Sequence, residues 1–149
     1  MYESYTGQAL PSKEYRELIG TAICVFNSNN SFVIENILRV DQTGQYEWHK
    51  LIDKVSGRLN GDGDIEQTIT ANSDETIAKL FSAIVDRRNR IVHSFQITAP
   101  AGTTDDPDNQ MLATKHKDGT QEILTEKYLM EFIKMNEELS TKLHQFRGF

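Results

Sequence analysis

Apolar side chains recur at helical spacing over most of the chain and predict five helices. These segments are residues 12–26, 32–40, 43–59, 73–95 and about 125 to the end. Ser12 and Ser73 are favourable N-cap residues for the first and fourth segments. The sequence "NSNNS" at 27–31 separates the first two segments, because Asn and Ser prefer helix ends and turns.

Between the last two helices the apolar positions alternate, which is typical of strands. The alternation covers "SFQITA" at 94–99 and "QMLATKHK" at 110–117. Asp118-Gly119 is a strong hairpin signal, and "TQEIL" follows it. The pattern therefore predicts a mainly α fold, a bundle of about five helices with a small β-hairpin insertion at about 96–124, before the last helix.

Length and composition narrow the class of protein. The 149 residues predict a single domain spanning 1–149. The net charge of −6 argues against a broad nucleic-acid coat but leaves room for a small basic pocket. Cys24 is the only cysteine, which favours a reducing, cytoplasmic setting. The chain has neither a signal-peptide pattern nor an apolar run of about 18 residues, so no membrane partner is expected.

The fourth predicted helix contains an anomaly, "DRRNRIVHSF" at 86–95. On a helical wheel Arg88 falls in the middle of the apolar sector, where a charge is unfavourable unless something compensates its burial. Arg87 and Arg90 fall outside that sector, where charges are solvated. The apolar residues of the sector are Ile77, Leu80, Phe81, Ile84, Val85, Ile91, Val92 and Phe95.

His93 follows Arg88 by five positions, which places it about 140° around an ideal helix. Asn89 lies one turn before His93 and could hydrogen-bond the imidazole. A straight helix would not bring Arg88 and His93 to one point. Joint action requires a long arginine reaching round, a distorted helix, or a groove shared with another subunit.

Residues 88–93 read R-N-x-x-x-H, which resembles the R-x(4–6)-H motif of the HEPN superfamily. The resemblance implies a metal-independent ribonuclease that acts as a homodimer, with the two motifs meeting in a cleft between protomers. Many members of the family serve in toxin–antitoxin or antiviral defence systems, which implies an antitoxin or defence partner protein. Some carry a tyrosine two residues after the histidine as a modification target, whereas this chain has Phe95 there.

The chemistry of these side chains suits RNA cleavage through the 2′-hydroxyl. His93 can transfer protons near neutral pH, and the planar fork of Arg88 suits a phosphate. Asn89 would position His93 or donate to a phosphate oxygen, while Arg87 and Arg90 could contact the RNA backbone. The expected products are a 2′,3′-cyclic phosphate and a 5′-hydroxyl. The scattered histidines and single cysteine predict no metal site, and no cofactor is expected.

Several alternatives remain open at the level of sequence. Arg87 also fits the motif, with a gap of five residues to His93. Arg88 could instead pair with a buried carboxylate, for which Glu35 is one candidate, in an unrelated helical bundle. The chain could also keep the HEPN shape without catalysis and act as a binding module through a partner protein.

Overall fold

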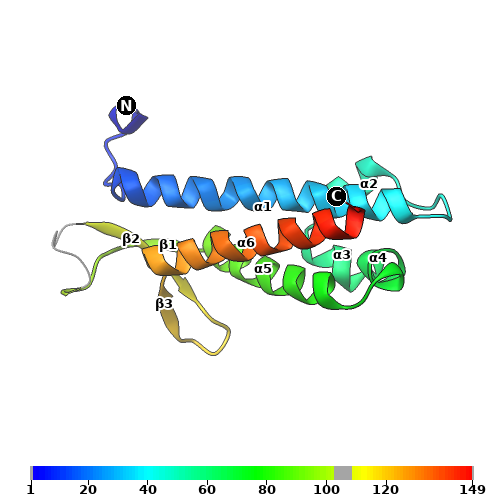
Figure 1. Cartoon of the computed structure of the whole chain (residues 1–149). Coiled ribbons are helices and arrows are strands. Elements are labelled where there is room, and N and C mark those ends of the chain that lie inside the picture. The colour runs from blue at the N-terminus through cyan, green and yellow to red at the C-terminus, as the bar shows by residue number, and fades with distance from the viewer. Residues whose placement is uncertain (1, 103–108, 149) are drawn as a thin grey trace.

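Three long helices form the body of the protein. The computed structural model describes residues 2–102 and 109–148. In these ranges α1 (Lys13–Val40), α5 (Thr76–Val92) and α6 (Glu126–Arg147) lie side by side. Figure 1 shows that α1 and α6 run in the same direction and that α5 runs in the opposite direction.

Polar contacts fix the parallel register of α1 and α6. The Tyr15 hydroxyl, near the start of α1, donates to the carbonyl of Leu124, just before α6 begins. Farther along, the Asn29 amide nitrogen donates to the Asn136 carbonyl and to its side-chain oxygen, at 2.8 and 3.0 Å. The two helices therefore begin at the same end of the bundle.

A phenylalanine cluster forms the centre of the core, with one ring from each long helix. The Phe26 ring stacks on Phe81 of α5 and on Phe132 of α6, with centroid separations of 6.3 and 6.4 Å. All three side chains are buried. Aromatic pairs at such distances stabilise a core beyond the area that they bury.

The predicted break at 27–31 is wrong, because α1 continues unbroken through that segment. Asn29 is buried, and its bonds to α6 satisfy an amide that would otherwise favour a helix end. Asn36 is also buried, and its amide donates to the Phe32 carbonyl one turn earlier, at 2.8 Å. A tertiary contact at Asn29 and an intrahelical bond at Asn36 thus override the local preference of these asparagines.

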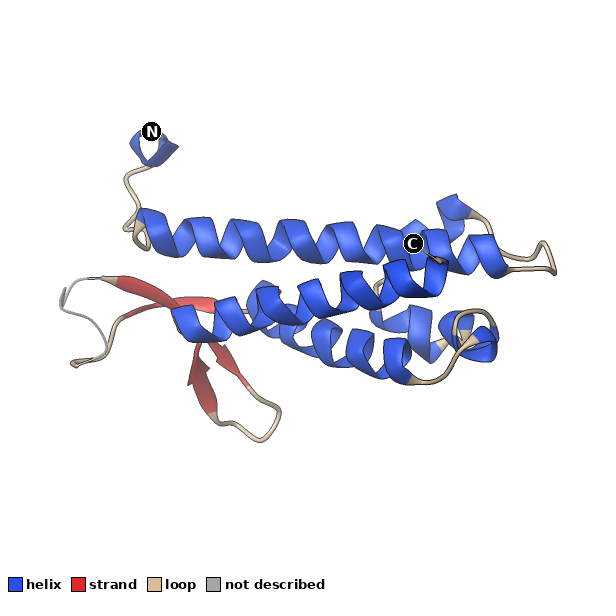
Figure 2. Cartoon of the chain, viewed as in Figure 1, coloured by secondary structure: helices blue, strands red, loops and turns tan. Residues whose placement is uncertain are grey.

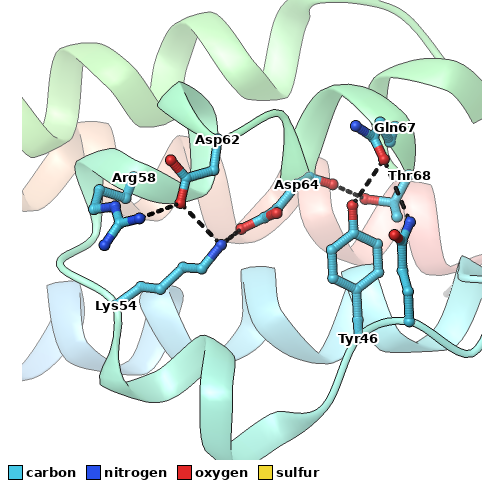
Figure 3. Close-up of polar contacts among 8 residues, drawn as sticks. Tyr46, Lys54, Arg58, Asp62, Asp64, Gln67 and Thr68 are labelled. Carbon is cyan, nitrogen blue, oxygen red and sulfur yellow. Dashed lines mark hydrogen bonds and ion pairs between the residues drawn. The ribbon is translucent and has the colours of Figure 1, made fainter.

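The predicted helix at 43–59 is also wrong in its extent, because the chain forms two short helices there. These are α2 (Trp48–Asp53) and α3 (Gly57–Gly61). Lys54 leaves the helix in an extended conformation, and its ammonium group binds the carboxylates of Asp62 and Asp64, at 3.0 and 2.6 Å (Figure 3). The expected apolar stripe is therefore incomplete, with Leu51 and Leu59 buried but Trp48, Ile52 and Val55 exposed.

Two further short elements complete the bundle before α5 begins. They are α4 (Asp64–Gln67) and a 3-10 turn at Thr70–Asn72, while another 3-10 turn covers Tyr2–Tyr5 near the start of the chain. Ser73 is not the N-cap of α5, since its hydroxyl donates to the Ile69 carbonyl at 2.7 Å. The Asp74 carboxylate instead accepts the amide of Thr76, at 2.8 Å.

The predicted β-hairpin is confirmed and is joined by a third strand. β1 (Phe95–Thr98), β2 (Gln110–Lys115) and β3 (Gln121–Ile123) form an antiparallel sheet in the order β1-β2-β3. Figure 2 shows this small sheet at the end of the bundle where α6 begins. The mainly α fold with a small sheet before the last helix is thus confirmed. Within the described residues, no helix is long and apolar enough to cross a bilayer.

Candidate functional site

Arg88 lies on the buried side of α5, as predicted, but it has no acidic partner among the residues that the structure describes. Its guanidinium carbon lies 4.8 Å from the centroid of the Phe26 ring, so the cation stacks on the central phenylalanine cluster. The Nε–H is buried without an acceptor, and no hydrogen bond or ion pair joins Arg88 to any residue in 2–102 or 109–148. Burial lowers the pKa of the guanidinium.

The proposed pairing of Arg88 with Glu35 is wrong. Glu35 lies on α1, and its carboxylate is 3.8 Å from the guanidinium of Arg147 near the end of α6. A desolvated cation without a counter-ion is unfavourable in a folded protein. Within the described residues, Arg88 is therefore a cation without an ion-pair partner, and its guanidinium stacks on an aromatic ring.

Arg87 and Arg90 are more enclosed than the sequence predicts, since both are half-buried. Arg87 lies over the ring of Tyr128, 5.1 Å from its centroid, with one nitrogen 3.5 Å from the Glu131 carboxylate. Arg90 donates from Nη1 to the carbonyl of Lys115 at 3.1 Å. Three arginines of one helical stretch thus contact three different elements, namely α1, α6 and β2.

His93 is the C-cap of α5, so the predicted extension of this helix to residue 95 is wrong. Its amide donates to the Asn89 carbonyl at 3.0 Å, and its backbone angles of −96° and 18° let the chain turn into β1. The imidazole is exposed and has no hydrogen-bonding partner in the part of the chain that the structure describes. The expected bond from the Asn89 side chain to the imidazole is not formed.

Apolar side chains on either side of His93 are open to solvent. Val92 and Phe95 were expected in the buried sector of α5, yet they are 52% and 41% exposed. Because α5 ends at Val92, Phe95 belongs to β1 and does not continue the apolar face of the helix. The imidazole therefore lies between two exposed apolar residues, at a position accessible to a second molecule.

Arg88 and His93, near the end of α5, can bind an anion and transfer a proton. Arg88 provides fixed positive charge, and the exposed imidazole of His93 provides a group that can accept or donate a proton. Across residues 2–102 and 109–148, no group of three or more His, Cys, Asp or Glu side chains lies close enough to hold a metal ion. The titratable groups of this end therefore suit acid–base chemistry on a phosphate ester.

Comparison with protein-family models, with curated proteins and with solved structures finds no match to this chain. Function must accordingly be inferred from the residues themselves.

Two neighbours of the motif could not be foreseen from sequence. Phe26 is the last residue of the first predicted helix, at 12–26, but nothing in the sequence pairs it with Arg88. Lys115 was expected in a strand, but nothing in the sequence places its carbonyl beside Arg90. Only the packing of α5 against α1 and β2 creates these contacts.

Proposed function

We propose that the protein is a metal-independent endoribonuclease of the HEPN type. One observation carries the proposal: Arg88 is a half-buried cation with no acidic partner in the described parts of the chain, stacked on Phe26, five residues before an exposed histidine. A structural arginine would be expected to bind a carboxylate. An arginine that binds substrate phosphate would instead be left without an acceptor until the substrate arrives.

In the proposed reaction the RNA supplies its own nucleophile. His93 accepts the proton of the 2′-hydroxyl, and the 2′-oxygen forms a bond to phosphorus as the bond from phosphorus to the 5′-oxygen breaks. The leaving 5′-oxygen takes up a proton from solvent or from a second histidine. Arg88 stabilises the charge that develops on the phosphate oxygens. The products are a 2′,3′-cyclic phosphate and a 5′-hydroxyl.

We further propose that the active form is a homodimer. Arg88 is directed towards α1, whereas His93 lies at the junction of α5 with β1, and no hydrogen bond joins the two side chains. A second copy packed over the exposed Val92 and Phe95 would bring another Arg88 and His93 to the same cleft.

Light scattering at micromolar concentration should give the mass of two chains, and Val92→Asp should shift the protein towards the monomer because it buries a charge in the contact. Ile52→Asp, on the exposed face of α2, is the matched control and should leave the mass unchanged. A wild-type protein that stays monomeric would contradict the dimer.

The decisive experiment is cleavage of total RNA, followed on a gel in buffer containing EDTA. We expect His93→Ala to reduce the rate by about 10²–10⁴-fold, the usual contribution of a general acid–base group. His49→Ala is the matched control, because His49 is also exposed and lies on α2, outside the site. Arg88→Met should also abolish cleavage.

Other outcomes discriminate between the candidate functions. Equal cleavage by wild type and His93→Ala would contradict the mechanism and would point to a contaminating nuclease. No cleavage by a folded, dimeric wild type would favour a non-catalytic binding module that acts through a partner protein. Restoration of EDTA-inhibited cleavage by a divalent ion would contradict metal independence.

We also propose a role as a toxin or antiviral defence effector, since a ribonuclease of this kind must be restrained in its own cell. Phe95 lacks the hydroxyl that modification of a tyrosine at this position would need. Control by an antitoxin that covers the exposed end of α5 is the mode consistent with this residue.

A further inference from the structure

The hairpin formed by β2 and β3 carries a short basic sequence next to the candidate site. Lys115, His116 and Lys117 occupy the end of β2 and the start of the turn. Arg90 donates to the Lys115 carbonyl at 3.1 Å, which fixes this part of the hairpin to α5 three residues before His93. Figure 1 shows the hairpin projecting from the bundle at the end where α5 gives way to β1.

The two lysines have no acidic partner in the described parts of the chain. Both are exposed, and neither takes part in an ion pair or a side-chain hydrogen bond within 2–102 or 109–148. Other exposed lysines differ in this respect: Lys50 lies 3.4 Å from Glu47 and Lys79 lies 2.9 Å from Glu75. Lys13 and Lys134 form no ion pair within the described residues, but they lie on α1 and α6 and not on the hairpin.

The acidic residues of the hairpin are already engaged by their own neighbours. The Asp118 carboxylate accepts the amide of Thr120 at 2.9 Å and its hydroxyl at 2.7 Å, and both bonds stabilise the turn. The Glu122 carboxylate lies 3.4 Å from the His116 imidazole. The positive charge of Lys115 and Lys117 is therefore directed outward, although the chain as a whole has a net charge of −6.

We propose that Lys115 and Lys117 form a backbone-binding arm that holds the phosphates of single-stranded RNA beside the cleavage position. The inference rests on the proposed ribonuclease function and adds to it where the strand lies. A lysine binds phosphate as a flexible point charge, so the arm contributes affinity without reading sequence. A single strand is the expected form, because in-line attack requires a 2′-oxygen that can swing behind the scissile bond.

Arg90 is the positioning residue of this arm. Its Nη1 donates a hydrogen bond to the Lys115 carbonyl, and its Nε is buried. The Arg90 side chain therefore lies at the junction of α5 with β2. This hydrogen bond joins the base of the arm to α5, three residues before His93. The RNA backbone would thus pass from the lysines of the hairpin to the guanidinium and imidazole of the motif.

The test measures RNA binding separately from cleavage. Full-length His93→Ala protein is titrated into a labelled single-stranded RNA, and fluorescence anisotropy gives the dissociation constant over a range of salt concentrations. The double change Lys115→Gln/Lys117→Gln is compared with Lys50→Gln/Lys79→Gln, which removes the same charge from exposed positions on α2 and the early part of α5.

The expected result follows from counterion release. Each phosphate of a single strand that the protein no longer neutralises lowers the slope of log affinity against log salt by about 0.7, so the double variant should show a slope smaller by about 1.4. At 0.1 M salt this corresponds to affinity weakened by about 25-fold when both lysines are replaced. Affinity for DNA of the same sequence should weaken by the same factor, because the arm binds phosphates.

Failure of the arm can be distinguished from failure of the proposed function. If the hairpin variant binds RNA as tightly as the charge-matched control, the arm is contradicted while the nuclease proposal stands. If the His93→Ala protein does not bind RNA, both are overturned. The same two lysine pairs in the otherwise wild-type chain give a second readout, since removal of the arm should raise KM and leave kcat unchanged.

Discussion

Two charged regions at different places in the bundle differ in whether their cations are paired. Near α3, Lys54 binds Asp62 and Asp64 at 3.0 and 2.6 Å, and Arg58 binds Asp62 at 3.0 Å (Figure 3). This cluster contains two cations and two anions, so it is neutral. At the other region, Arg88 lies half-buried on an aromatic ring and forms no ion pair with any carboxylate in residues 2–102 or 109–148.

The comparison separates charge that holds the fold from charge that is available to a ligand. The cluster around Lys54 connects α2, α3 and α4, and it raises the pKa of the lysine, chiefly through its hydrogen bond to Asp64. For Arg88 the only cause of a pKa shift is burial, which lowers the pKa of the guanidinium. Protein groups thus satisfy the charge of Lys54, whereas no hydrogen bond or ion pair within the described residues satisfies the charge of Arg88.

The largest effect that tests this difference is on stability. Lys54→Met removes the partner of Asp64, which is 4% exposed, and leaves a buried carboxylate without a counter-ion. Breaking such a pair should lower the free energy of unfolding by about 3 kcal/mol. Arg88→Met should change it by no more than about 1 kcal/mol, because removal of the cation–π interaction is offset by relief of desolvation.

Urea unfolding of the two variants beside wild type measures this prediction. Methionine keeps the unbranched apolar stem in both cases, so the difference reports the charge rather than the packing. A fall of similar size in both variants would show that Arg88 has a structural partner after all. An unchanged Lys54→Met would show that the cluster near α3 does not hold the fold.

The sequence predicts which helices and strands form better than it predicts where each of them begins and ends. The apolar face of α5 as far as Ile91 follows from local periodicity, and the hairpin follows from the Asp118-Gly119 turn signal; the structure confirms both. The continuity of α1 could not be predicted, because it depends on the bond between Asn29 and Asn136, 107 residues apart. The break at Lys54 also involves residues later in the chain, because Lys54 ends α2 and its ammonium group pairs with Asp62 and Asp64.

The candidate site was predictable in its residues but not in its arrangement. The wheel places Arg88 in the buried sector, and the structure agrees. The helical wheel cannot show that Phe26 lies under the guanidinium, or that no carboxylate among the described residues pairs with it. The position of His93 also escaped prediction, because the helix ends there as the chain enters β1, a strand that forms only by pairing with β2. These features depend on tertiary packing, which local periodicity does not encode.

A smaller effect tests whether the unpaired arginine accepts an anion. We expect inorganic phosphate, added at constant ionic strength, to raise the melting temperature of wild type more than that of Arg88→Met. A ligand at ten times its dissociation constant stabilises a protein by about 1.4 kcal/mol, which corresponds to a shift of about 3–6 °C for a domain of this size.

Arg58→Met is the control variant, because Arg58 is already paired with Asp62, and this variant should respond as wild type does. General exclusion of phosphate from protein surfaces would raise all three melting temperatures equally. An equal shift in Arg88→Met would therefore mean that Arg88 binds no phosphate, and the contrast between the two charged regions would carry no functional meaning.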